Sequence, residues 1–417
     1  MANIRDAINE FNPWWKGGFD LKLKEREVYG RMQKFMTMPH IIALVGLRRV
    51  GKTSIMQQII KDYLDRGFER RRIFYFSFDE FRNSDIREIL TVYEDMVGFG
   101  LRDGKYLVLL DEIQKNDGWE NQLKVLYDLY GKNVKFIISG SESLFIRKNT
   151  KESLAGRLFE FKIEPLNFKE FLAFKEARYD NIKLYSEELR RAFWEFSQTM
   201  GFPELVGVRD KDLIKKYLKE GIVDKVLYRD IPQMIGIRDA PALDAILNVF
   251  MEDPGQMADL NELAAELKIS RQTISSYVYY LEAAFLLNKL YNYSGSRRKV
   301  ERKLKKYYPE IISVDLLMRD DDHSRSRVFE WFVVTRLGAE FFWRDPFKNE
   351  VDVIMADGTP LEIKYGKIDL AGIKAFMRKF KRKKGIVITH REKGTRKEDG
   401  FEINLIPAYE FLLRFPL

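Results

Sequence analysis

The strongest constraint on the fold is the run Gly46-Leu47-Arg48-Arg49-Val50-Gly51-Lys52-Thr53, which is followed by Ser54. It stands between an apolar stretch, residues 41–45, and a helical period that continues to about residue 64. Glycines in such a turn let backbone N–H groups surround phosphate oxygens at the N-terminus of a helix. The pattern in this context therefore predicts a phosphate-binding loop, and all nine of these residues are expected to contact ATP.

Two further polar strand ends complete the predicted nucleotide site. Lys52 is expected to reach the β and γ phosphates, while Thr53 and Asp111 bind Mg²⁺. Residues 107–110 form an apolar run that ends in Asp111 and Glu112, and Glu112 is expected to polarise the attacking water. The apolar run 134–138 leads to Ser139 and Ser141, and either hydroxyl can sense the γ phosphate.

Composition excludes several other classes of protein. The chain has no cysteine and three scattered histidines, so thiol chemistry and a histidine-rich zinc centre are excluded, and any metal is expected on carboxylates. The longest uncharged run, residues 35–47, is too short for a membrane span, and residues 1–15 lack the order of a secretory signal. A cytoplasmic protein without membrane association is expected, and the absence of cysteine with abundant charge suits a thermophile.

Hydrophobic patterns divide the 417 residues into four parts. Five apolar runs alternate with helical periods up to residue 165, which predicts an α/β fold with a parallel sheet covered on both faces. Residues 166–240 lack strand signals and are expected to form a helical lid. Residues 241–310 and 311–417 are expected to form two further domains, the last of mixed helix and strand.

A helix-turn-helix is predicted at residues 260–281. The first helix places Leu263 and Ala264 on its buried face, and Ser270 caps a second helix. That helix turns polar side chains outward, and a basic turn follows after residue 293, so the segment resembles the winged helix of origin-binding ATPases. Such modules contact either DNA or protein partners, and both alternatives remain open at this stage. The residues expected to contact DNA are Arg271, Gln272, Ser275, Tyr279, Arg297, Arg298 and Lys299.

The net charge of +9 is concentrated in two stretches. Residues 297–306 and 374–384 each carry seven basic side chains and together at most one acidic one, so the rest of the chain is net negative. Such patches indicate a polyanionic partner, for which DNA is the expected candidate, while the alternative is two solvated lysine-rich faces.

The C-terminal part contains ordered carboxylates. Glu330 stands in a helical run, Asp352 in a short strand, and Glu362 and Lys364 lie two apart on the next strand, so the last two share a face. This order resembles the PD-(D/E)xK nuclease superfamily, although Val351 replaces the proline of its namesake motif. The resemblance implies a restriction-endonuclease-like domain in which Glu330, Asp352 and Glu362 hold Mg²⁺ and Lys364 orients water. A degenerate nuclease fold that only makes contacts is the alternative.

The motifs together resemble the AAA+ and STAND types of P-loop ATPase. The nearest resemblance is to an archaeal branch with Asn-Pro-Trp-Trp near the start, here residues 12–15. By that resemblance Arg157 is an arginine finger of a homo-oligomer, while Pro203 and the segment around Arg26 lie near the adenine. The catalytic residues would then be Lys52, Asp111, Glu112 and Arg157.

The sequence thus predicts an ATPase that couples nucleotide state to action on DNA, with metal-dependent DNA cleavage as a possible part of that action. The alternative is a STAND-type nucleotide switch that controls oligomerisation or partner binding and carries an inactive nuclease-like domain.

Overall fold

The computed structural model describes residues 4–19, 21–82, 84–141, 153–237, 239–296, 298, 300 and 303–414. The chain separates into two compact units, Met1–Pro165 and Leu166–Leu417, and each is described by itself. Within the described ranges no helix is both long enough and apolar enough to cross a bilayer.

The first unit is built on a parallel sheet with the strand order β2-β3-β4-β1-β5. Its strands are β1 (Ile41–Val45), β2 (Ile73–Ser77), β3 (Tyr106–Asp111), β4 (Val134–Gly140) and β5 (Leu158–Lys162). The predicted parallel sheet of five strands is confirmed. Strands β1 and β3 are buried throughout, as is typical of apolar runs in parallel sheets, whereas β5 at the sheet edge is only partly buried.

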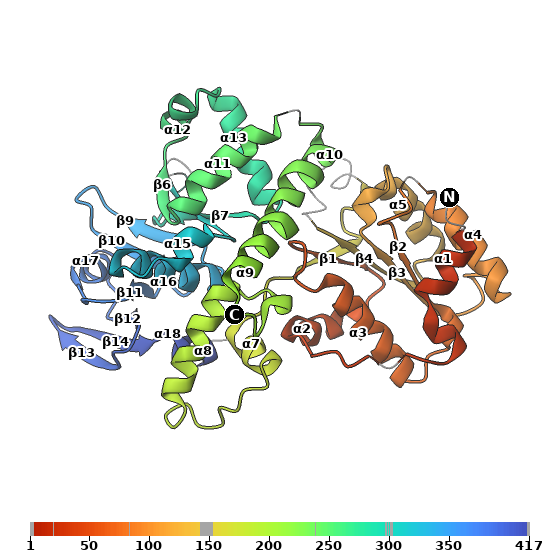
Figure 1. Ribbon diagram of the computed structural model, residues 1–417, viewed down its shortest axis with the longest axis horizontal. Coiled ribbons are helices and arrows are strands. Elements are labelled where there is room, and N and C mark those ends of the chain that lie inside the picture. The colour runs from red at the N-terminus through yellow and green to blue at the C-terminus, as the bar shows by residue number, and fades with distance from the viewer. Residues whose placement is uncertain are drawn as a thin grey trace. The chain divides into compact units, whose positions relative to one another are not determined.

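Helices lie on both faces of this sheet (Figure 1). The described helices of this unit are α1 (Ile4–Phe11), η1 (Pro13–Lys16), α2 (Glu27–Met36), α3 (Lys52–Asp65), η2 (Arg70–Arg72), α4 (Ile86–Val97), η3 (Ile113–Lys115) and α5 (Trp119–Tyr130). Helix α3 begins at Lys52, directly after the glycine-rich loop. The carboxyl ends of β1 and β3 lie at the same end of the sheet. The loop, Asp111 and Glu112 therefore lie together there.

The Asn-Pro-Trp-Trp segment closes the exposed edge of this sheet. Asn12 exchanges hydrogen bonds of 2.8 and 2.9 Å with the backbone of Tyr75, and the indole N–H groups of Trp14 and Trp15 both donate to the carbonyl of Ile73. These side chains satisfy backbone groups of β2, which is an edge strand, and so protect it from pairing with another chain.

The second unit begins with helices, as predicted. They are α7 (Phe168–Phe174), α8 (Ser186–Thr199), η5 (Pro203–Leu205), α9 (Lys211–Leu218), the π-helical turns η6 (Lys219–Val223) and η7 (Val226–Asp230), and α10 (Ile231–Ile235). The predicted helix pair follows after α11 (Ala240–Glu252) as α12 (Leu260–Leu267) and α13 (Arg271–Ala283), and the Ser270 side chain accepts the Thr273 N–H as the expected cap.

A nine-stranded sheet runs through the rest of this unit in the order β13-β14-β12-β11-β10-β9-β7-β8-β6. The strands are β6 (Gln256–Ala258), β7 (Leu287–Asn292), β8 (Lys305–Pro309), β9 (Phe341–Arg344), β10 (Glu350–Ile354), β11 (Pro360–Lys364), β12 (Lys384–Thr389), β13 (Gly394–Glu398) and β14 (Phe401–Pro407). The predicted third and fourth domains therefore share a sheet. The reason is the parallel pairing of Tyr291 and Asn292 in β7 with Phe341 and Phe342 in β9.

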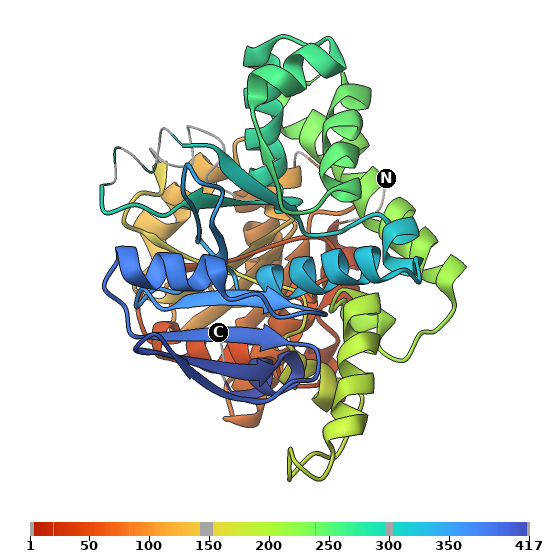
Figure 2. The same ribbon diagram turned by 90° about the vertical axis from the view of Figure 1, so that its left-hand side faces the viewer.

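Further helices among the described residues of this unit are α15 (Val314–Met318), α16 (Asp322–Arg336), α17 (Ala371–Lys379) and α18 (Ala408–Arg414). Helix α15 packs on α16, and the other three pack on the C-terminal strands. Helix α16 packs on β11 and α17 on β10, β11 and β12, and Figure 2 shows both helices beside these strands. The core beneath α17 is aromatic and aliphatic, with Trp343, Ile373 and Phe376 fully buried.

Candidate functional site

The glycine-rich loop has the backbone geometry that a phosphate site needs. Gly46 and Gly51 adopt φ angles of 148° and 99°, which only glycine adopts without strain. A Cβ atom at Gly46 would also lie 2.2 Å from the carbonyl oxygen of Ile163. The Lys52 ammonium donates to the carbonyls of Gly46 and Leu47 at 3.0 and 2.9 Å, so it lies inside the curve of the loop. Arg49 and Ser54 are exposed, and Leu47 and Val50 are buried.

Hydrogen bonds bring the predicted magnesium ligands together. The Thr53 hydroxyl donates to Asp111 Oδ2 at 2.8 Å, although the two residues lie on α3 and β3. The Ser139 hydroxyl donates to the other oxygen of Asp111 and accepts the Glu112 N–H at 3.1 Å. A hydroxyl and a carboxylate at this spacing form the hard-oxygen donor set that Mg²⁺ requires, so the residues present fit the metal.

Tyr75 and Gln114 also belong to this site, although neither is part of a recognisable sequence motif. The Tyr75 hydroxyl donates to Asp111 Oδ2 at 2.7 Å, and its pKa is raised by burial and by the nearby charge of Asp111. The Gln114 amide donates to Glu112 Oε2 at 2.7 Å and to the Ser141 hydroxyl at 3.1 Å. Their contacts orient the two acidic side chains.

Arg26 supports the loop from a distant part of the sequence. Arg26 is 6% exposed, and its guanidinium donates to the carbonyls of Val50 and Glu164, both at 2.8 Å. The observed contacts thus hold the loop against the end of β5, and the expected contact with adenine stays a prediction. Pro203 lies in the second unit, so its relation to the loop stays a prediction as well.

Arg157 lies at the end of the sheet opposite the loop. Its carbonyl accepts the N–H of Ile41 at the start of β1, whereas the loop follows the end of that strand. Five strand residues span about 15 Å, so the Arg157 guanidinium is beyond reach of a phosphate in its own loop. It instead forms a 3.1 Å ion pair with Asp128.

A second group of charged residues lies in the C-terminal strands. Asp352 and Glu362 are each 6% exposed, and Asp352 Oδ2 accepts the Ile363 N–H at 2.7 Å. Burial, and then the negative charge of Glu330, raise the pKa of Asp352 to about 7. Burial and the charge of Asp352 raise the pKa of Glu362. The three predicted carboxylates are thus electrostatic neighbours.

Lys364 faces the same group. Its ammonium lies 2.6 Å from Glu362 Oε1, while Glu362 Oε2 is buried with no hydrogen-bond partner among the described residues. Burial alone would lower the pKa of Lys364, but Glu362 and Asp352 raise it to about 12. An unsatisfied buried carboxylate oxygen fits a divalent cation. Across the described residues, however, no group of three or more histidine or acidic side chains is close enough to hold a metal ion, so Asp352 and Glu362 would have to hold it with water.

Lys306 was expected on a basic surface but is buried in this group. It is 6% exposed and forms ion pairs with Glu350 and, at 3.7 Å, with Glu330, to which the Tyr308 hydroxyl also donates at 2.8 Å. Lys374 is likewise paired with Glu398 and Asp399. Lys306 and Lys374 are therefore not free surface cations, whereas the other basic residues of the second stretch are exposed: Arg378, Lys379, Lys381, Arg382, Lys383 and Lys384.

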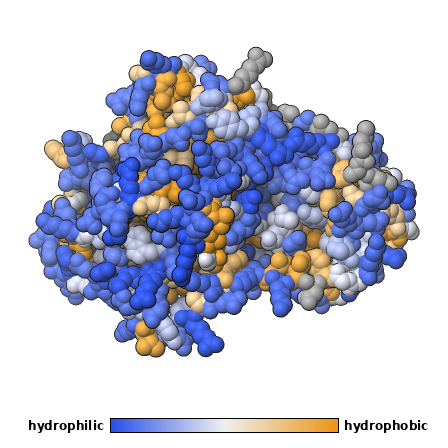
Figure 3. Space-filling model, in the orientation of Figure 1, coloured by the Kyte–Doolittle hydropathy of each residue, from blue (hydrophilic) through white to orange (hydrophobic). Residues whose placement is uncertain are grey.

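The predicted DNA-contacting helix exposes the expected side chains. Arg271, Gln272, Ser275 and Tyr279 are exposed on α13, and Arg298 is exposed in the connection between β7 and β8. Arg297 and Lys299 lie outside the described residues. The face shown in Figure 3 is mainly hydrophilic, with a hydrophobic area over α12 and α13. Both DNA contact and protein contact therefore stay predictions for this module.

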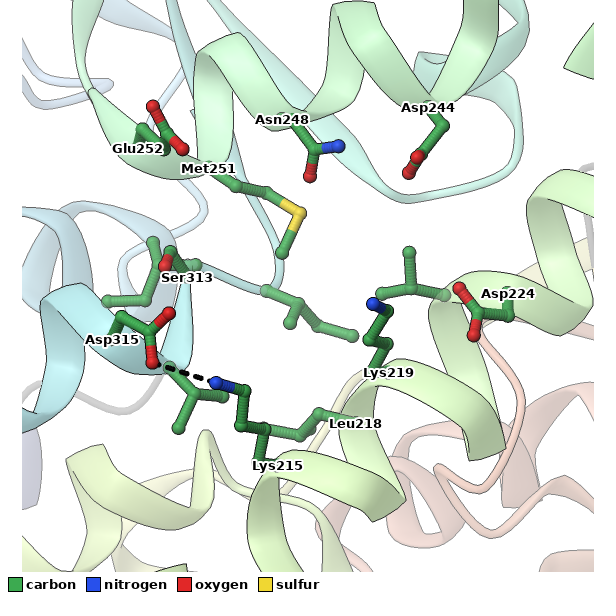
Figure 4. A pocket seen from close by; sticks show the side chains of 14 residues that line it. Lys215, Leu218, Lys219, Asp224, Asp244, Asn248, Met251, Glu252, Ser313 and Asp315 are labelled. Atoms are coloured by element: carbon green, nitrogen blue, oxygen red, sulfur yellow. Dashed lines mark hydrogen bonds and ion pairs between the residues drawn. The ribbon is translucent and has the colours of Figure 1, made fainter. Parts of the chain in front are cut away.

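The second unit also contains a separate cavity of about 350 Å³ (Figure 4). Apolar side chains such as Leu218 and Met251 line it together with charged ones, and Lys215 and Asp315 form a 2.9 Å ion pair at its margin. None of the residues predicted to bind nucleotide, metal or DNA lines this cavity.

The five-stranded parallel sheet with its glycine-rich loop is the fold of a P-loop, AAA-like domain. In agreement, residues 38–172 match the family model of an AAA domain, and residues 190–309 match that of a domain of unknown function.

Relatives extend the similarity over more of the chain. An uncharacterized protein of Methanocaldococcus jannaschii is 32% identical over 292 residues, which are 66% of this chain and 62% of that protein. An uncharacterized protein of Haemophilus influenzae is 29% identical over 62% of this chain and 64% of its own length. The chain therefore spans less than two thirds of these relatives. The structure of C. elegans PCH-2 is similar over 39% of this chain and 45% of that one, with 13% identity, but its TM-score of 0.25 is too low to support an argument.

Proposed function

We propose that this protein is an ATPase that couples ATP binding and hydrolysis to action on DNA. The observation that carries the ATPase assignment is the 2.8 Å hydrogen bond between Thr53 and Asp111, which joins the two magnesium ligands beside the phosphate-binding loop. Lys52 neutralises the β and γ phosphates, and Glu112 polarises the attacking water. Bound Mg²⁺ supplies further neutralisation of phosphate charge.

We propose that the action on DNA is hydrolysis of a phosphodiester at the C-terminal carboxylates. Asp352 and Glu362 would hold a divalent cation that polarises the phosphate and activates water. Lys364 orients that water through its ammonium. The water oxygen forms a bond to phosphorus and loses a proton, the bond from phosphorus to one ester oxygen breaks, and that oxygen leaves as a hydroxyl group that takes up the proton released by the water. The buried, unsatisfied Glu362 Oε2 supports this proposal.

Two assays test the parts separately. ATP turnover by the wild type should rise when DNA is added. The substitution Lys52→Ala should abolish ATP turnover with and without DNA. Cleavage of single-stranded, duplex and branched DNA should require Mg²⁺ or Mn²⁺ and should disappear in Asp352→Ala. Cleavage that survives this substitution belongs to another site or a contaminant, and no cleavage by the wild type refutes the nuclease proposal.

One observation favours a second candidate function. The Lys306 ammonium already pairs with Glu330 and Glu350 beside Asp352, and so partly neutralises the site without a metal. This arrangement suits an inactive nuclease-like domain in a nucleotide switch that controls oligomerisation or partner binding. In that case ATP should change the molar mass measured by light scattering, and DNA should leave turnover unchanged.

A further inference from the structure

Four aromatic rings meet beyond the C-terminal ends of β11, which carries Glu362, and of its neighbour β12. They come from separate elements: Trp194 from α8, Phe329 from α16, Tyr365 after β11, and His390 after β12. Tyr365 and His390 are stacked, with ring centroids 4.8 Å apart and planes 15° apart. The Trp194 N–H donates to His390 Nε2 at 3.3 Å, and Phe329 packs edge-on against Tyr365 and His390. Phe329 is buried, while the other three rings are partly exposed.

Arginines surround this stack. Arg190 lies one helical turn before Trp194, Arg325 one turn before Phe329, and Arg391 follows His390 and is exposed. Burial and then the charges of Arg391, Arg190 and Arg325 lower the pKa of His390 to about 4. The imidazole is therefore neutral at physiological pH. Although Arg190 and Arg325 also pair with Glu187 and Asp320, the three guanidinium groups make the surroundings of the rings electropositive.

The residues of the stack are neighbours, in the sequence or across paired strands, of residues of the carboxylate site. Tyr365 directly follows Lys364, and Phe329 directly precedes Glu330. Thr389, the neighbour of His390, is the register partner of Lys364 across β11 and β12. The rings and the carboxylate site are therefore built on the same helix and strand, α16 and β11.

We propose that the Trp194, Phe329, Tyr365 and His390 cluster binds single-stranded DNA. A base extends the Tyr365–His390 stack, while the arginines neutralise neighbouring phosphates. Aromatic platforms combined with basic side chains are the usual means of binding single strands, because every base has a face that stacks. In a duplex those faces already stack on neighbouring bases, and exposing one costs energy. The proposal rests on the proposed action on DNA and specifies its substrate as a single strand.

The test is equilibrium binding of fluorescently labelled single-stranded and duplex oligonucleotides of equal length, measured by anisotropy in EDTA so that cleavage cannot occur. The wild type should prefer the single strand. Tyr365→Ala should weaken that binding about 5- to 150-fold, the range for loss of one base stack. Tyr365→Phe keeps the ring and should retain affinity. Phe347→Ala removes an aromatic side chain that is 86% exposed elsewhere in this unit, and it should change nothing.

A salt titration separates the charge contribution from stacking. Arg391→Gln should reduce the slope of log affinity against log salt by about 1, without removing the preference for single strands. Equal binding of single strands by wild type and Tyr365→Ala, with thermal melting showing both folded, overturns the cluster proposal while leaving the proposed action on DNA intact. Tighter binding of duplex than of single strand also overturns it. Failure of the wild type to bind either DNA overturns both proposals.

Discussion

Replacing Asp352 by Asn should stabilise the protein at pH 8 in the absence of divalent metal. The pKa of Asp352 is raised from 3.8 to about 7, chiefly by burial, so ionisation of this carboxyl opposes folding. This destabilisation is absent below pH 4, where the Asp352 carboxyl is protonated in both the folded and the unfolded state. It reaches its full size above pH 7, where the carboxyl is ionised in both states. About three pH units at ~1.36 kcal/mol each set an upper limit of ~4 kcal/mol. Asn never ionises, and its carbonyl can still accept the Ile363 N–H.

Thermal and denaturant unfolding of wild type and Asp352→Asn at pH 4 and pH 8, both in EDTA, measure this effect. The variant should gain stability over the wild type only at the higher pH. Added Mg²⁺ should stabilise the wild type more than the variant, since a ligand that binds only the folded state at 100 times its Kd contributes ~2.7 kcal/mol. Glu410→Gln is the matched control. It removes a buried carboxylate that is paired with Lys393 and Arg414, so it should destabilise the protein. Equal stability of wild type and Asp352→Asn at pH 8 would refute the reasoning.

Three other outcomes follow from the nucleotide site. Tyr75→Phe removes a hydrogen bond to Asp111, so the Mg²⁺ concentration that half-saturates ATP turnover should rise about tenfold, and an unchanged Mg²⁺ titration would contradict this role. Glu112→Gln should bind ATP with wild-type affinity but stall hydrolysis, and normal turnover would disprove water activation. Arg157 lies outside this site, so if it acts as a finger in a neighbouring subunit, as the family resemblance implies, Arg157→Ala should bind ATP but lose ~10³- to 10⁵-fold in hydrolysis rate. Mixing it with Lys52→Ala should restore some turnover, whereas near-normal turnover by Arg157→Ala alone would make Arg157 a surface charge.

Local patterns explain why the core of the first unit could be predicted. Most of its strands are short apolar runs, which can be recognised without knowledge of distant residues. The loop from Gly46 to Thr53 can be recognised in the same way, because its backbone conformation requires glycine at fixed positions. The helix pair at residues 260–283 was equally accessible, because its period and its Ser270 cap are local.

Residues that act across long sequence separations could not be predicted in the same way. Tyr75 reaches Asp111 from a neighbouring strand, and Arg26 reaches Val50 and Glu164 from before the sheet begins. Lys306 illustrates a different failure. From composition it was expected among surface cations, but on β8 it is buried and its ammonium pairs with the partly exposed carboxylates of Glu330 and Glu350. The shared nine-stranded sheet also depends on a pairing of Tyr291 with Phe341, which no single segment encodes.

The most direct test of the account is the rate of ATP hydrolysis by the wild type and by Lys52→Ala, each with and without single-stranded DNA. The account predicts measurable turnover by the wild type, a rise when DNA is added, and no turnover by Lys52→Ala under either condition. Turnover that survives the loss of Lys52 would contradict the assignment of the phosphate-binding loop. Wild-type turnover that DNA leaves unchanged would contradict the proposed coupling to DNA.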